Sequence, residues 1–144
     1  MKNIKYLILL VIPMLVITGC GSKKTLKCEK TNSTITYNFN KDKMSKIEIK
    51  DVIDLSNEKD EIENFSEYAK MIENQYNEVY ENIKGIKYTL EDSEKDYTIT
   101  ITLEIDTNKI NNDELSEISS LVKNSDLNYK DAKEFMENNG YTCK

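Results

Sequence analysis

Several residue types on which many active sites depend are missing from this chain. Its 144 residues include no His, no Arg and no Trp, and Pro13 is the one proline. Without His there is no Ser-His-Asp or Cys-His nucleophile system and no His-ligated zinc. Without Arg, at a net charge of −6 and a pI near 4.8, a surface that neutralises nucleic-acid phosphates is not expected. These absences argue against His-dependent enzymes and against a nucleic-acid partner.

What is present describes a soluble globular chain. Charged residues make up 32% of the sequence and hydrophobic residues 38%, with a mean hydropathy of −0.63. Such values are typical of a water-soluble domain and not of a membrane bundle. The length suits one domain.

The first 17 residues have the layout of an export signal. Two lysines and no acid precede an apolar run from Tyr6 to Ile17, which is interrupted only by Pro13. As a helix this run would span roughly 18 Å, short of the roughly 30 Å hydrocarbon core of a membrane. The run therefore fits the apolar region of a secretory signal and not a membrane span. No A-x-A-like cleavage site follows it.

The end of the apolar run carries a second signal. Ile17-Thr18-Gly19-Cys20 resembles the lipobox of bacterial lipoproteins. The resemblance implies cleavage between Gly19 and Cys20 and lipidation of Cys20 with diacylglycerol and a fatty acid such as palmitate. Two acyl chains suffice for stable anchoring, where one is marginal. We therefore expect a protein lipid-anchored to the cell membrane on its extracytoplasmic face. The alternative is a secreted protein with a stray cysteine at the end of its signal.

This interpretation divides the chain into residues 1–19 as signal peptide, 20–27 as lipidated tether and 28–144 as one globular domain. Cleavage would leave 125 residues without proline, with 18 Lys against 26 acidic residues and a net charge of −8. That charge argues against a further electrostatic attraction to anionic lipids. The acyl chains of Cys20 are thus expected to be the whole membrane contact.

The remaining cysteines, Cys28 and Cys143, enclose almost the whole mature domain. Outside the reducing cytosol an even pair favours a disulfide. Closing a loop of more than 100 residues would contribute roughly 4–5 kcal/mol in the chain-entropy model. The alternative is two free buried thiols. Two cysteines without His make an incomplete metal site, and no C-x-x-C supports a redox role.

Hydrophobic periodicity predicts an α+β fold with the element order ββα-ββ-αα. Apolar and polar residues alternate along the predicted strands, so the sheet has one apolar and one polar face. It is expected to be four-stranded and antiparallel, with helices on the apolar face and water on the other. The strands are expected at 34–40, at 44–55 with a bulge at Val52-Ile53, at 86–90 and at 97–105. The helices are expected at 58–84 with Asn57 as N-cap and Gly85 as stop, at 113–123, and at 129–138 with Asn128 as N-cap.

The order of these features resembles a family of small bacterial lipoproteins typified by YehR. Besides the lipobox Cys20, the resemblance rests on a segment after the long helix, on an Asp-x-x-Lys element after a strand, and on the terminal helix. These read Asn82-Ile-Lys-Gly85-Ile-Lys-Tyr88, Ile105-Asp106-Thr-Asn-Lys109 and Phe135-Met136-Glu137-Asn-Asn-Gly140-Tyr141. The resemblance implies a compact α+β lipoprotein domain. It implies no activity, because the function of the family is uncharacterised.

Other motifs are explained as well by chance or by solubility. Ser-x-x-Lys occurs at Ser56/Lys59 and at Ser120/Lys123, without the S-D-N and K-T-G motifs that accompany it in acyl-transferases. The stretch from Asp106 to Glu117 resembles a calcium loop at positions 1, 3 and 12 but not at positions 5 and 6. Acidic clusters at 60–63 and 91–96 are typical of solvated faces.

The sequence therefore favours a non-catalytic binding domain of the cell envelope, with no catalytic residue, no metal and no cofactor. Its expected partners are membrane lipid, through Cys20, and an envelope protein or small ligand of unknown identity. Two alternatives stay open. One is a cation-binding or sensing module, suggested by the negative charge, and the other is a carboxylate-based cell-wall hydrolase, suggested by location and acidic residues.

Overall fold

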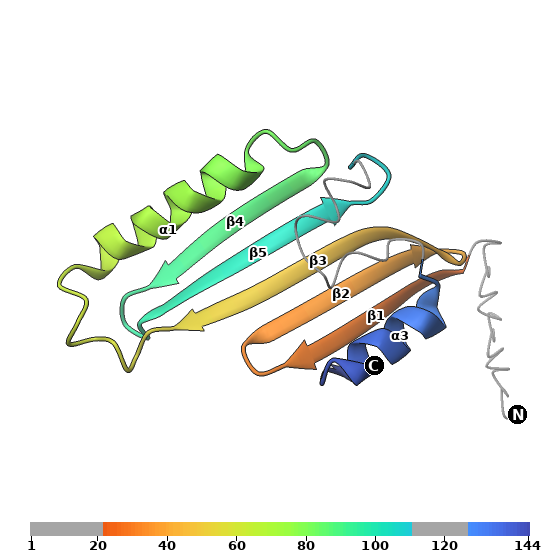
Figure 1. The fold of residues 1–144 in the computed structure, drawn as a ribbon, viewed down its shortest axis with the longest axis horizontal. Coiled ribbons are helices and arrows are strands. Elements are labelled where there is room, and N and C mark those ends of the chain that lie inside the picture. The colour runs from red at the N-terminus through yellow and green to blue at the C-terminus, as the bar shows by residue number, and fades with distance from the viewer. Residues whose placement is uncertain (1–21, 111–126) are drawn as a thin grey trace, which may run out of the picture.

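A computed structural model describes residues 22–110 and 127–144 (Figure 1). This part of the chain forms one antiparallel sheet of six strands and two helices. In chain order the elements are β1 (Lys23–Lys30), β2 (Ser33–Asn40), β3 (Lys43–Asp54), α1 (Phe65–Tyr80), β4 (Ile86–Ser93), β5 (Thr98–Asp106), α3 (Tyr129–Asn138) and β6 (Thr142–Cys143).

The strands lie in the order β4-β5-β3-β2-β1-β6, and all neighbours are antiparallel. Tight turns join β1 to β2 and β2 to β3, and in each turn one residue has a positive φ, 60° at Asn32 and 59° at Lys41. After β3 the chain passes through α1 to the outer strand β4, and β5 then returns between β4 and β3. The antiparallel pairing of β4 with β5 brings the start of β4 beside the end of β5.

The expected four-stranded sheet in the order ββα-ββ-αα is wrong. Three strands precede α1, because residues 23–27, expected as part of the tether, belong to β1. In β1 only Leu26 and Cys28 are buried, so its alternation of apolar and polar residues is too short to stand out in the sequence. The sixth strand, β6, has two residues and forms by pairing with β1. The helix expected at 113–123 lies outside the described residues.

The long helix is shorter than its apolar periodicity suggests. It begins at Phe65, where the side chain of Asn64 accepts a hydrogen bond from the Glu67 backbone N–H at 3.2 Å, and not after Asn57. It ends at Tyr80, five residues before Gly85. The last helix, by contrast, has the predicted bounds and N-cap: the Asn128 side chain accepts hydrogen bonds from the backbone N–H groups of Lys130 and Asp131.

The bulge expected at Val52-Ile53 is absent from the β3–β5 pairing. Asp51 pairs with Ile101 and Ile53 with Ile99, so both lie on the helix-bearing face, while Val52 lies on the opposite face. The alternation of the strand is regular; a polar and an apolar residue have simply exchanged faces. The irregular register lies between Asn38 and Phe39, where β2 pairs with the start of β3.

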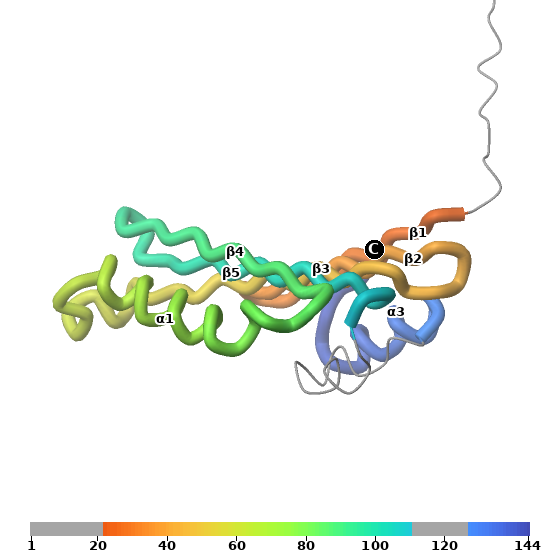
Figure 2. The backbone as a smooth tube through the Cα atoms, turned by 90° about the horizontal axis from the view of Figure 1, so that it is seen from above, coloured from red at the N-terminus to blue at the C-terminus, as the bar shows by residue number. Residues whose placement is uncertain are grey.

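Both described helices lie on one face of the sheet, towards opposite ends (Figure 2). On that face the buried side chains form two clusters. One cluster joins Ala132 and Met136 of α3 to the inner residues of β1, β2 and β3. The other joins Phe65 and Ala69 of α1 to Ile99 of β5. The sheet is thus the common support of two helix-covered cores.

The structure joins Cys28 of β1 to Cys143 of β6 in a disulfide, with an S–S distance of 2.01 Å. The two residues are direct partners in the register of these strands. Backbone hydrogen bonds between Lys27 and Lys144, at 3.1 and 2.8 Å, continue the pairing. The link therefore fastens the C-terminal end of the described chain to the edge of the sheet.

Candidate functional site

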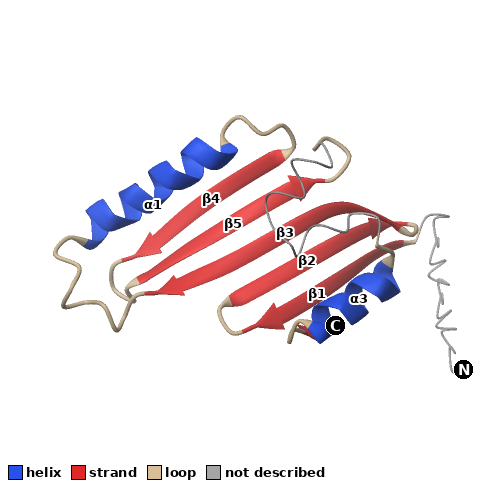
Figure 3. Ribbon diagram, viewed as in Figure 1, coloured by secondary structure: helices blue, strands red, loops and turns tan. Residues whose placement is uncertain are grey.

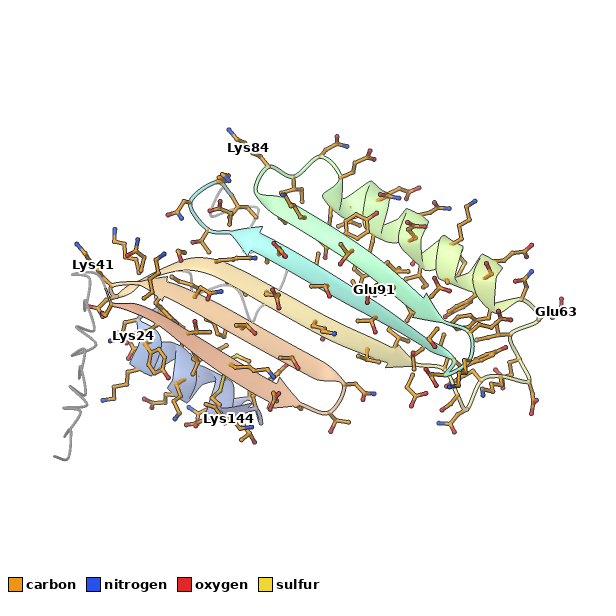
Figure 4. The ribbon with its side chains drawn as sticks, turned by 180° about the vertical axis from the view of Figure 1, so that it is seen from behind. Lys24, Lys41, Glu63, Lys84, Glu91 and Lys144 are labelled. Atoms are coloured by element: carbon orange, nitrogen blue, oxygen red, sulfur yellow. A yellow bond between two sulfur atoms is a disulfide. The ribbon has the colours of Figure 1, made fainter. Side chains whose placement is uncertain are left out.

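The face of the sheet opposite the helices is polar, and no described helix or strand covers it (Figures 3 and 4). The strand registers align its side chains in rows that cross the sheet. Threonine is the commonest residue in these rows, at positions 25, 34, 36, 89, 98, 100 and 102, and Lys and Glu supply most of the rest. Such a face can make hydrogen bonds and ion pairs, but it offers no aromatic ring on which a sugar could stack.

One end of this face is hollowed into a pocket of about 430 Å³. It lies where the starts of β3 and β4 meet the end of β5 and the turn that follows. We call it the charged pocket; its lining residues are Ser45, Lys46, Gly85, Ile86, Lys87, Glu104, Asp106, Asn108 and Lys109.

A close approach at Gly85 builds the pocket. Gly85 has a φ of 95°, and a Cβ placed on it would stand 2.9 Å from the Cβ of Lys109. Its carbonyl accepts a hydrogen bond from the Asp106 backbone N–H at 2.8 Å. Only glycine fits this conformation and this space without strain. The segments 82–88 and 105–109, which carry the sequence resemblance, therefore meet here.

Two ion pairs fix the charges of the pocket. Lys46 Nζ lies 2.8 Å from Glu104 Oε2, and Lys109 Nζ lies 2.8 Å from Asp106 Oδ2. The hydrogen bond that Lys46 donates to Glu104 raises the pKa of Lys46. The hydrogen bond from Lys109 lowers the pKa of Asp106, and the backbone N–H of Asn108 adds to this. Both shifts favour the charged form, that of the Lys46 ammonium and that of the Asp106 carboxylate. This favours recognition over proton transfer.

Lys87 is the lysine of the charged pocket that belongs to neither ion pair. It stands opposite Glu104 in the β4–β5 register and is exposed. Within the described part of the chain it has no ion pair, since Glu104 is bonded to Lys46. Its ammonium group can therefore bind a carboxylate or another anionic group that enters the pocket, beside the fixed charges of the two ion pairs.

The residues singled out in the sequence lie elsewhere or have local roles. Gly19, Cys20, Ser120 and Lys123 are outside the described residues. Lys59 lies over the ring of Tyr97, 4.9 Å from its centroid. Asp106 Oδ1 accepts hydrogen bonds from both nitrogens of Asn108, so it stabilises the turn in the way a capping residue does.

The described residues, 22–110 and 127–144, hold neither a metal-binding cluster nor a membrane-spanning helix. They contain no group of three or more carboxylate or cysteine side chains placed to hold a metal ion. They also contain no helix with the length and hydrophobicity needed to cross a bilayer.

Comparison with known proteins gives structural neighbours only. No family model and no curated protein sequence matches the chain. The solution structure of YehR from E. coli superimposes with a TM-score of 0.64 over 85% of this chain and 90% of that one, at 19% identity. This chain has the fold of YehR. The likeness expected from the sequence is confirmed at the level of fold. A protein from Streptococcus pneumoniae is also similar, with a TM-score of 0.56 and 14% identity over 100% of this chain and 98% of that one.

Proposed function

We propose that this protein is a lipid-anchored binding domain of the bacterial cell envelope, held on the extracytoplasmic face of the membrane through Cys20. It binds an envelope protein or a small ligand through the polar face of its sheet and the charged pocket. The observation that carries the binding role is a polar face that no described element covers, ending in a pocket whose exposed Lys87 has no ion pair among residues 22–110 and 127–144. The lipobox residues Ile17 to Cys20 support the anchor.

The argument for binding rests on charged groups of the polar face that can still interact with a ligand. An antiparallel sheet normally hydrates one face, so polarity alone marks no site. Here, however, the polar face also holds a concave region in which charged groups from β3, β4 and β5 converge, and convergent polar groups are what fixes the orientation of a ligand in a site. Because the two carboxylates are already paired and Lys87 is not, the pocket selects for a negative group on the ligand.

Photo-crosslinking in living cells tests this function. A photoreactive residue replaces Thr102 on the polar face, and a matched one replaces Glu78, which is exposed on α1. We expect discrete crosslinked products from position 102 alone. Lys87→Glu should abolish them, whereas Lys70→Glu, the same charge change on exposed α1, should not. Equal products from both positions, or none from position 102, would contradict the binding role.

Intact-mass measurement of the protein purified from membranes tests the anchor separately. The expected mass is that of residues 20–144 plus diacylglycerol and a fatty acid. Cys20→Ala should leave the signal uncleaved and remove the lipid. A native mass that includes Met1 would refute the anchor.

A further inference from the structure

The charges of the described chain are separated along the length of the sheet. At one end lie the start of β1 and the β2–β3 turn, which we call the basic end: Lys23, Lys24, Asp42, Lys41 and Lys43. The register places Lys23 opposite Asn40 and Asn40 opposite Lys43, so the two segments are adjacent. All four lysines are exposed, and the single acid lies 3.9 Å from Lys24. These two segments thus hold four cations and one carboxylate; the charged pocket lies at the same end, and each of its two ion pairs sums to zero charge.

The far end of the sheet is acidic. There the loop after β3 lies against the β4–β5 turn, held by a hydrogen bond of 2.8 Å from the Leu55 N–H to the Tyr97 carbonyl. Figure 4 shows Lys24 and Lys41 at one end of the molecule and Glu63 at the other. This acidic end has two lysines, Lys59 and Lys95, and many more exposed carboxylates. The carboxylates are those of Asp54, Glu58, Asp60, Glu61, Glu63, Glu91, Asp92, Glu94 and Asp96.

The basic end is also the end at which the chain leaves the anchor. Cys20 precedes Lys23 by three residues, and three residues of fully extended chain span at most about 10 Å. The Debye length at physiological ionic strength is about 8 Å. A lipid on Cys20 therefore holds the basic end, and not the acidic end, within the range at which charges act on the headgroups.

We infer that the basic end rests on an anionic membrane surface as a second attachment beside the acyl chains, and that the acidic end points away from the membrane. The inference rests on the proposed anchor at Cys20. A lysine near an anionic leaflet gains about fivefold in binding, from about 1 kcal/mol per charge. The carboxylates of the acidic end are repelled by the same surface, so both ends favour one orientation. The negative net charge of the chain does not reveal this preference for one orientation, because it is a sum over two ends of opposite charge.

Lysine footprinting of the native lipidated protein tests the orientation. The protein is reconstituted into vesicles of phosphatidylcholine alone or with phosphatidylglycerol, treated briefly with an acetylating reagent, and analysed by peptide mass spectrometry. In anionic vesicles we expect acetylation at Lys41 and Lys43 to be about fivefold slower than in neutral ones. Lys59 and Lys95 at the acidic end should react equally in both. At 1 M salt, where the Debye length is about 3 Å, the protection should disappear.

A pair of variants controls for net charge. Lys41→Glu with Lys43→Glu should abolish the protection of Lys23 and Lys24 in anionic vesicles. Lys59→Glu with Lys95→Glu makes the same change in net charge at the acidic end and should preserve that protection. Equal reactivity in neutral and anionic vesicles, or equal loss in the two variants, would overturn the inference while leaving the anchor in place. A protein without lipid in its intact mass would overturn both proposals.

Discussion

Replacing Gly85 by Ala tests the packing that builds the charged pocket. The new Cβ would stand 2.9 Å from Lys109 Cβ, 3.0 Å from the Ile110 nitrogen and 3.2 Å from the Asp106 carbonyl oxygen. Two of these neighbours are backbone atoms of the turn after β5, which cannot rotate away as the end of a side chain can. The φ of 95° is a further cost for any residue with a Cβ.

Gly140→Ala separates these two costs. Gly140 has a similar φ of 82°, but the nearest atom to its added Cβ is the exposed Lys30 Nζ, at 3.7 Å. This substitution carries the backbone strain alone, about 1 kcal/mol once the reduced entropy of the unfolded chain is counted. Gly85→Ala adds an overpacking cost of about 1–3 kcal/mol. Its free energy of unfolding should therefore fall by about 2–4 kcal/mol.

Urea denaturation of both variants, with circular dichroism as the probe, measures the two free energies of unfolding. The comparison holds when the dependence of the free energy on urea concentration has the same slope in both variants. In the folded Gly85→Ala protein we also expect shifted amide resonances at residues 106–110 and weaker ligand binding in the pocket. Equal destabilisation of the two variants would refute the reasoning, because it would show that the approach of Gly85 to the turn carries no energetic weight.

Three further predictions concern stability. Replacing Cys28 and Cys143 together by Ser should lower the free energy of unfolding by about 5 kcal/mol in the chain-entropy model, because the link spans 115 residues; calorimetry checks this, and an unchanged melting temperature would contradict it. Asn64→Ala should cost about 1 kcal/mol by removing the N-cap of α1, while Asn57→Ala should stay within about 0.5 kcal/mol in the same urea assay. Burial raises the pKa of the Tyr37 hydroxyl well above its ordinary value of 10.0, so above pH 10 the folded state binds more protons than the unfolded state. The free energy of unfolding should then fall by up to about 1.4 kcal/mol per pH unit, and Tyr37→Phe should flatten that slope relative to the parent between pH 10 and 11.5.

The sequence predicts well where local pattern and burial agree. The alternation Tyr97 to Ile105 is nearly the observed β5, Thr98–Asp106, because every second residue from Ile99 to Ile105 is buried. The terminal helix was predicted with its cap because Asn128 and the apolar face of 129–138 point to the same bounds. In both cases a single stretch contains the whole signal.

Prediction fails where an element depends on a partner distant in the chain. The two residues of β6 form a strand only because Cys143 meets Cys28 across 115 residues. The α1 boundary was misplaced because residues 58–62 continue the apolar period with Ile62, although their hydrogen bonds are those of turns. Local periodicity cannot distinguish a turn that packs against Tyr97 from the first turn of a helix.

The charged pocket was invisible for the same reason. Its two ion pairs join residues from β3, β5 and the turn after β5, and the close approach of Gly85 depends on the exact register of β4 and β5. The sequence does contain one useful indication, Gly85, which lies between Lys84 and Lys87 at the start of a strand. A glycine there indicates a backbone conformation that other residues disfavour, but only the strand order reveals which atoms come near it.

If the proposed lipid anchor at Cys20 holds the domain by its first residues, the disulfide has a mechanical consequence. A pull on the tether enters the sheet at Lys23 and runs along β1, whose eight residues all pair with β2. The hydrogen bonds of that pairing are loaded side by side, so they resist together instead of opening one after another. The covalent link at Cys28 passes part of the load to the C-terminal strand and to α3. A force on the tether is thus shared between the β1–β2 hydrogen bonds and the C-terminal elements.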